Sequence, residues 1–154
     1  HLGKHLIVDA MSTFGAIEIE THSIPFDCLV SASGKCLEGI PGIGLTLVRR
    51  DLLARSGGNA RSLSLDLHDQ WREFEATGQW RFTPPTQVVS ALDSALHELM
   101  EEGGVKARRK RYSRNRDMLV KSMRARGFKT FLRDDDQSPI IITFCAPDDP
   151  NQRH

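Results

Sequence analysis

Two side chains in the first quarter of the chain stand where they could do chemistry together. Lys35 follows a strand-like pair, Leu29 and Val30, and a run of small residues at positions 31–34, and a glycine-rich turn comes after it. Asp9 comes directly after an apolar run at positions 6–8. Because the carboxyl ends of neighbouring parallel strands meet at one edge of a sheet, we expect Asp9 and Lys35 to face one site from different strands.

A carboxylate and a lysine in this arrangement suit pyridoxal phosphate. An amine that is partly removed from water favours its neutral, nucleophilic form, which can form a Schiff base with an aldehyde. A carboxylate can pair with the protonated pyridine nitrogen and keep the ring electron-poor. The spacing alone leaves open the alternative that Lys35 is a solvated residue at the end of a strand.

Several motifs resemble those of the class-V aminotransferases, which have the pyridoxal-phosphate fold type I. The two central motifs are VDAMSTFG at positions 8–15 and SASGKCLEGIPG at positions 31–42, and 26 residues separate Asp9 from Lys35. Three further segments, 60–67, 69–71 and 80–83, resemble the members of this family that transfer an amino group from 2-aminoethylphosphonate to pyruvate. The resemblance covers nearly the whole chain and favours the interpretation of Lys35 as the cofactor lysine.

The resemblance implies roles for five residues. Lys35 would form the Schiff base with pyridoxal phosphate and later move a proton, and Asp9 would hold the proton of the pyridine nitrogen. Met11 would pack on the ring, Ser12 would belong to the cofactor-binding residues, and Thr83 would reach the cofactor phosphate of the neighbouring subunit in a homodimer. The alternatives are core packing for Met11 and a turn position for Thr83.

The implied reaction takes a small-molecule amino donor, 2-aminoethylphosphonate, and pyruvate, and gives phosphonoacetaldehyde and alanine. Alanine:glyoxylate or serine:pyruvate transamination is the alternative on the same scaffold, and a truncated, non-catalytic remnant that dimerises is the alternative of another class. The resemblance places the phosphate-binding loop before residue 1 and the substrate-binding arginine after residue 154, so we expect the isolated chain to be inactive. Relatives commonly carry an amide side chain where this chain has Gly34.

The expected fold class is α/β. The resemblance implies part of the fold type I large domain, a mainly parallel sheet flanked by helices, followed by the start of a small carboxy-terminal α+β domain. We predict the end of the cofactor-binding domain at 1–104, a connecting helix at 105–127 and the start of the small domain at 128–154. Periodicity and turn residues predict strands near 6–8, 29–30, 45–48, 128–132 and 140–144, and a short strand or extended segment at 17–20. They also predict helices capped by Asp51 and Thr86, and a helical pattern that starts at Asp66 and ends at Gly78.

Composition excludes several other classes of protein. With 154 residues, 39% of them hydrophobic, and a formal net charge of +1, the chain can bury one core and shows no sign of a polyelectrolyte partner. Seven lysines and arginines lie between positions 106 and 116, but an apolar stripe continues across them, so we expect a solvated helix face and no nucleic-acid partner. No apolar run has the length of a membrane span.

The cysteines and histidines add two expectations. Three cysteines without paired spacing favour a reducing compartment, which we take to be the cytoplasm. The six histidines lack the spacing of zinc ligands, so no metal site is expected.

Overall fold

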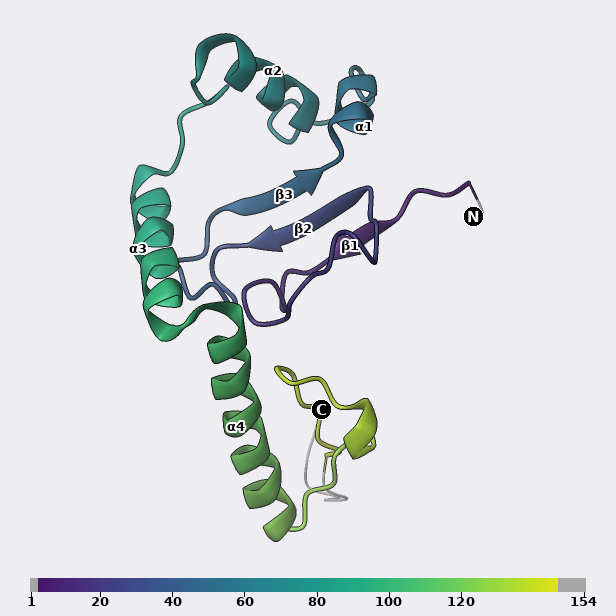
Figure 1. Ribbon diagram of the computed structural model, residues 1–154, viewed down its shortest axis with the longest axis vertical. Coiled ribbons are helices and arrows are strands. Elements are labelled where there is room, and N and C mark those ends of the chain that lie inside the picture. The colour runs from purple at the N-terminus through teal and green to yellow at the C-terminus, as the bar shows by residue number, and fades with distance from the viewer. Residues whose placement is uncertain (1–2, 147–154) are drawn as a thin grey trace.

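The computed structural model describes residues 3–146. In chain order the elements are strands β1 (Ile7–Asp9), β2 (Cys28–Ala32) and β3 (Gly44–Val48), helices α1 (Arg50–Arg55), α2 (Leu67–Thr77), α3 (Thr86–Glu102) and α4 (Gly104–Ala125), and the 3-10 helix η1 (Asp134–Asp136). Figure 1 shows that α4 leads away from the sheet and that the segment after α4 returns alongside it.

The three strands form one mixed sheet in the order β1-β2-β3. Strand β1 pairs with β2 in parallel, with Asp9 opposite Val30, and β2 pairs with β3 antiparallel, with Ala32 opposite Gly44. The expected α/β class is confirmed, but the described sheet has one parallel and one antiparallel pair, because β2 returns directly into β3 without a crossover helix. The parallel pair places the carboxyl ends of β1 and β2 at the same edge.

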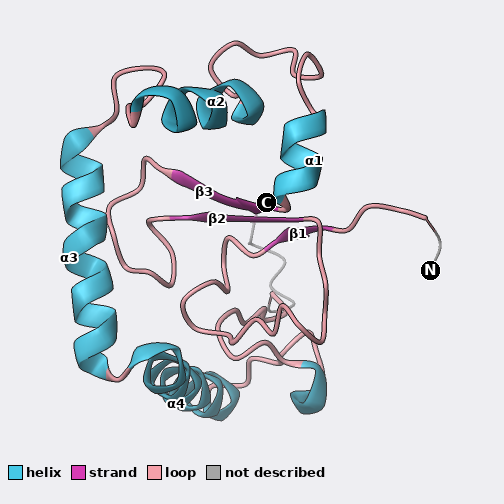
Figure 2. Cartoon of the chain, turned by 45° about the horizontal axis from the view of Figure 1, so that its top comes forward, coloured by secondary structure: helices cyan, strands magenta, loops and turns pink. Residues whose placement is uncertain are grey.

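Helix α3 lies along the end of the sheet at which β1 and β2 finish (Figures 1 and 2). The segment between β2 and β3, residues 33–43, is here called the lysine loop, and two of its glycines, Gly39 and Gly42, lie against α3. A Cβ at Gly42 would lie 3.1 Å from Val88 Cγ2, and a Cβ at Gly39 would lie 3.5 Å from Leu92 Cα. The absence of side chains at these two positions therefore lets the loop approach the helix closely.

The bounds of α2 follow from local sequence, as predicted. Asp66 is the residue before the helix, and its Oδ1 accepts a hydrogen bond from the Asp69 backbone N–H at 3.1 Å. Gly78 ends the helix with a φ of 70°, which glycine adopts without a steric penalty. Gly103, with a φ of 106°, does the same between α3 and α4.

Two other helix starts differ from the predictions. Asp51 lies in the first turn of α1 and does not cap it, because the helix begins at Arg50 and its N-cap position is Arg49. The Asp51 carboxylate instead pairs with Arg49 and Arg55. Thr86 is the first residue of α3, whose N-cap position is Pro85, and no side chain caps this helix. The predicted caps at Asp51 and Thr86 are therefore wrong.

Two of the predicted strands, at 128–132 and 140–144, do not form, and neither does the strand that was one alternative for 17–20. Residues 10–17 wind into consecutive turns in which Ala10 and Thr13 carbonyls accept backbone hydrogen bonds, so the segment at 17–20 keeps only the bridge between Phe14 and Ile17. The segments at 128–132 and 140–144 meet at a single antiparallel bridge, Thr130 with Phe144. Ile141 is 53% exposed, so the second segment is not the buried strand that its apolar run predicted.

The helix predicted at 105–127 is α4, while the division into domains at its two ends stays a prediction. Across residues 3–146, each helix falls short of the length or the hydropathy that crossing a bilayer requires.

Candidate active site

Asp9 is the last residue of β1 and is exposed. Its Oδ1 accepts a hydrogen bond from the Met11 backbone N–H at 2.9 Å. The next residue, Ala10, is buried and continues the pairing with β2, because its N–H donates to the Val30 carbonyl at 2.8 Å. The Asp9 side chain is thus held at the edge of the sheet by the turn that follows its strand.

The lysine loop is closed at its base by Ser33, which is 0% exposed. The Ser33 N–H donates to the Ile43 carbonyl at 3.1 Å, its hydroxyl donates to the Ile40 carbonyl at 2.6 Å, and its own carbonyl accepts from the Gly39 N–H at 2.9 Å. Lys35 lies in the turn above this base, where its carbonyl accepts from the Glu38 N–H at 2.8 Å. The buried Ser33 and its hydrogen bonds therefore hold together the two ends of the loop from which Lys35 extends.

The Lys35 side chain is exposed, whereas the sequence predicted an amine partly removed from water. The reason is local, because Ser33, Gly34 and Gly39 present almost no side-chain bulk that could cover it.

The turn after β1 and the lysine loop pack against each other. The buried Cys36 thiol donates to the Ser12 carbonyl at 3.1 Å, and a Cβ at Gly15 would lie 2.8 Å from Leu37 Cδ2. Burial raises the pKa of the Cys36 thiol, which suits a packing role and not a nucleophile. Asp9, Met11, Ser12 and Lys35 are therefore carried by two adjoining turns at one edge of the sheet.

Thr83 is the one predicted site residue that the structure leaves apart from the others. It is exposed in the segment between α2 and α3, which Figure 1 shows on the β3 side of the sheet, whereas Asp9 belongs to β1 on the opposite edge. Within residues 3–146 no hydrogen bond or ion pair joins Thr83 to Asp9 or Lys35. Its assignment to the neighbouring subunit's site stays a prediction.

The structure adds a group of side chains at the lysine loop that the sequence did not predict. Arg108, in the second turn of α4, is 2% exposed. Its Nη1 donates to the carbonyls of Cys36 at 2.9 Å and Leu37 at 3.3 Å, and its Nε donates to Glu102 Oε2 at 2.8 Å. The expected solvated face is therefore wrong for Arg108, which is buried against the loop that carries Lys35.

Glu38, a residue of the lysine loop, faces Arg108 of α4. Its carboxylate accepts hydrogen bonds from Arg111 Nη2 at 2.9 Å and from the Tyr112 hydroxyl at 2.8 Å, and Arg108 Nη2 lies 3.4 Å away. Burial raises the pKa of Glu38, but the hydrogen bonds from Tyr112 and Arg111 outweigh it and hold this pKa below the ordinary value. Glu38, Glu102, Arg108, Arg111 and Tyr112 are here called the Arg108 cluster.

The pKa values of Glu102 and Tyr112, two further members of the Arg108 cluster, are shifted as well. The hydrogen bond from Arg111 is the main reason that the pKa of Glu102 falls from 4.5 to about 2. Burial, with the hydrogen bond to Glu38, raises the pKa of Tyr112 to about 12. One signal in the sequence could have pointed to this cluster: Arg108, Arg111 and Tyr112 are spaced three and four apart, which places them on one face of a helix.

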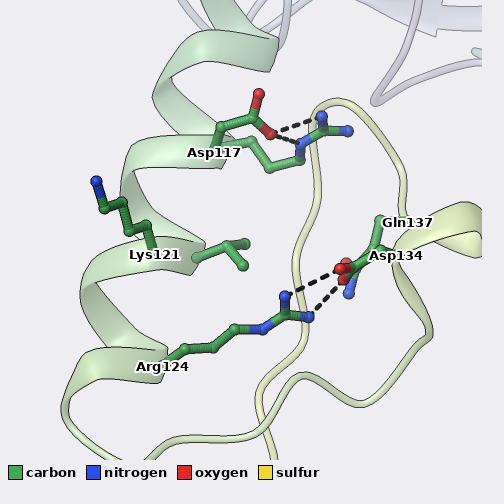
Figure 3. Close-up of a pocket in the computed structure, with 7 residues that line it drawn as sticks. Asp117, Lys121, Arg124, Asp134 and Gln137 are labelled. Carbon is green, nitrogen blue, oxygen red and sulfur yellow. Dashed lines mark hydrogen bonds and ion pairs between the residues drawn. The ribbon is translucent and has the colours of Figure 1, made fainter.

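A cleft of about 460 Å³ lies elsewhere, between the second half of α4 and the segment around η1 (Figure 3). Arg124 closes one side of it by pairing with Asp134, at 3.1 Å between Nη1 and Oδ2. Arg116, Asp117 and Lys121 line the α4 side. None of these residues belongs to the turns that carry Asp9 and Lys35, so the cleft is separate from the candidate site.

Asp66, His68 and Asp69 each place one potential metal-ligand atom within 4.8 Å of the others. Their contacts are those of a helix start, since Asp66 caps α2 and Asp69 pairs with Arg81 at 3.0 Å. We assign these three residues to the start of the helix.

Comparison with known proteins decides the family. The model of the family described as aminotransferase class-V matches residues 2–150. The chain belongs to the class-V aminotransferases. The family expected from the motifs around Asp9 and Lys35 is thereby confirmed.

This class-V chain is 60% identical over 148 residues to 2-aminoethylphosphonate–pyruvate transaminase from Cupriavidus taiwanensis, covering 96% of the chain and 39% of that protein. It is 54% identical over 151 residues to the transaminase of the same name from Pseudomonas aeruginosa, covering 98% of the chain and 41% of that protein. The chain thus spans only 39–41% of the length of these curated relatives.

Solved structures agree on the fold of this class-V chain. The pyridoxamine–pyruvate aminotransferase of Mesorhizobium loti superposes with a TM-score of 0.82 at 26% identity, over 95% of this chain and 38% of that one. The alanine–glyoxylate aminotransferase of a Nostoc species superposes with a TM-score of 0.78 at 21% identity, over 95% of this chain and 39% of that one. The α/β arrangement is therefore that of an aminotransferase segment.

Proposed function

We propose that the complete protein is a pyridoxal-phosphate-dependent transaminase that transfers the amino group of 2-aminoethylphosphonate to pyruvate, giving phosphonoacetaldehyde and alanine. The observation that carries the proposal is the placement of Asp9 and Lys35 on adjoining turns at the shared end of β1 and β2. The choice of substrates rests on the identity of 54–60% to proteins named for this reaction.

The residues present fit pyridoxal phosphate. Asp9 uses one carboxylate oxygen on the Met11 N–H, so its other oxygen can accept a hydrogen bond from the protonated pyridine nitrogen. Lys35 extends from a loop with little bulk and is open to a planar ligand. When bound, the cofactor supplies an electron-poor ring that stabilises negative charge on the substrate carbon.

Each proposed residue then has a distinct task. Lys35 Nζ would hold the cofactor through a Schiff base, and the lysine amine, once free, would accept the proton that leaves the substrate carbon. The Asp9 carboxylate keeps the ring nitrogen protonated by charge. Met11 is 38% exposed and can cover a ring face, and the Ser12 carbonyl fixes the adjoining loop through Cys36.

A homodimer completes the proposal, with Thr83 reaching the cofactor phosphate of the neighbouring subunit. The three cysteines are free thiols, which favours a reducing compartment, and we propose the cytoplasm. The isolated 154 residues are expected to be inactive, since by the family resemblance the phosphate loop and the substrate arginine belong to other parts of the protein.

Alanine formation tests the proposed function. The complete gene product should form alanine from 2-aminoethylphosphonate and pyruvate much faster than from other donors, and Lys35→Ala should abolish this. Lys110→Ala is the matched control, because Lys110 is an exposed lysine on α4. Equal or faster turnover with alanine and glyoxylate would instead assign the alternative reaction, and turnover that survives Lys35→Ala would overturn the site.

A further inference from the structure

We propose that Arg108 is a positioning residue for Lys35, which fixes the lysine loop through the backbone and through Glu38. The inference rests on the proposed function of Lys35 as the cofactor lysine, and it assigns to the start of α4 a part in the active site.

The first argument is where the guanidinium donates. Arg108 Nη1 is bonded to the carbonyls of Cys36 and Leu37, the two residues that follow Lys35. These are charge-assisted hydrogen bonds in a buried setting, which are stronger than neutral ones. They fix the Cys36–Leu37 and Leu37–Glu38 peptide planes, which begin one residue after the lysine, and these planes limit how far the turn that contains Lys35 can move.

The second argument is the strained backbone of the same loop. Within residues 3–146 Glu38 is the one non-glycine residue with a positive φ, 62°. Such a conformation persists only where the surroundings over-determine it, and strain of this kind gathers at functional sites. Arg111 and Tyr112 hold its side chain, while its N–H bonds to the Lys35 carbonyl at 2.8 Å. The Arg108 cluster therefore imposes the turn that contains Lys35.

The third argument concerns the free energy lost when the Arg108 guanidinium is removed from water. A buried arginine loses its hydration, and replacing such a group by apolar residues of similar volume is often neutral or stabilising. Stability alone is thus a weak reason for a guanidinium that is 2% exposed. The planar guanidinium donates hydrogen bonds to two carbonyls and to Glu102 at once, which no apolar side chain can do.

Two measurements on the complete gene product test this role. The first is hydrogen exchange of the Glu38 and Gly39 amides, which bond to the Lys35 and Ser33 carbonyls, in protein freed of cofactor. The second is the rate at which added pyridoxal phosphate becomes trapped on Lys35 by borohydride. Arg108→Met should speed the exchange of both amides about tenfold and slow the trapping about tenfold. Arg108→Lys should restore part of each effect.

Arg109→Met is the matched control, because Arg109 is the exposed neighbour and carries the same charge. It should leave exchange and trapping unchanged. If Arg108→Met does not fold, Tyr112→Phe removes only the hydroxyl that donates to Glu38 and should speed exchange at Glu38 about fivefold.

The possible failures are distinguishable. No trapped adduct in the unsubstituted protein refutes the proposed function and this inference with it. A normal adduct in the unsubstituted protein, together with unchanged exchange and trapping in Arg108→Met or unchanged exchange in Tyr112→Phe, refutes the positioning role alone.

Discussion

Replacing Glu102 by Gln tests the electrostatics of the Arg108 cluster. Glu102 is the last residue of α3, and its two carboxylate oxygens accept from Arg108 Nε at 2.8 Å and Arg111 Nε at 2.7 Å. The substitution keeps the shape and removes the charge. It therefore separates the ion pairs from the packing between α3 and α4.

The magnitude follows from the pKa of Glu102, which the hydrogen bond from Arg111 lowers from 4.5 to about 2. At about 1.4 kcal/mol per unit, this corresponds to about 3 kcal/mol of the free energy of unfolding. The Glu102 side chain is 22% exposed, so screening by water reduces the contribution to about 1.5 kcal/mol. Because the folded-state pKa is depressed, this stabilisation is complete above pH 4.5 and is lost as the pH falls toward 2.

The assay is urea unfolding of the complete gene product and of its Glu102→Gln variant at about pH 7 and about pH 3. The variant should be less stable by about 1.5 kcal/mol at the higher pH and by less than half of that at the lower pH. Glu101→Gln, at the exposed neighbouring position, is the control and should show no such difference. A loss of stability that is equal at the two pH values would refute the reasoning, since it would then arise from packing and not from charge.

Three further substitutions test other parts of the site. Asp9→Asn should retain bound cofactor but reduce kcat about a hundredfold, because an amide cannot hold a pyridinium by charge; near-normal turnover would contradict this. Thr83→Ala chains combined with Lys35→Ala chains should give active heterodimers, because one site carries both substitutions and the other carries neither. Heterodimers without activity would show that Thr83 does not serve the site of the neighbouring subunit. Gly34→Ala should lower the free energy of unfolding by about 1–3 kcal/mol, since its Cβ would lie 2.9 Å from Pro41 N, while Gly44→Ala, which meets nothing within 4 Å, should be tolerated at the same denaturant midpoint.

The sequence predicted those features that depend on neighbouring residues. Asp66 and Gly78 mark the ends of α2 because capping is decided within one turn of a helix. The shared edge of Asp9 and Lys35 was predictable as well, because each residue follows an apolar run that forms a strand.

The features that were missed depend on contacts between distant parts of the chain. Arg108 lies 72 positions from the carbonyl of Cys36 that it contacts, so its helical spacing with Arg111 and Tyr112 could indicate a shared face but not the loop against which Arg108 is buried. The segments at 128–132 and 140–144 have strand-like composition, but they pair at one bridge only. Strand formation depends on a paired neighbour, which local propensity does not supply.

The most direct test of the proposed site is reduction of the complete, cofactor-loaded gene product with borohydride, followed by mass mapping of the modified lysine. We predict that the pyridoxyl group is found on Lys35 and that Lys35→Ala removes it, while Lys110→Ala does not. A modified lysine at any other position, with Lys35 left unmodified, would contradict the assignment of Lys35 and of the site built around it.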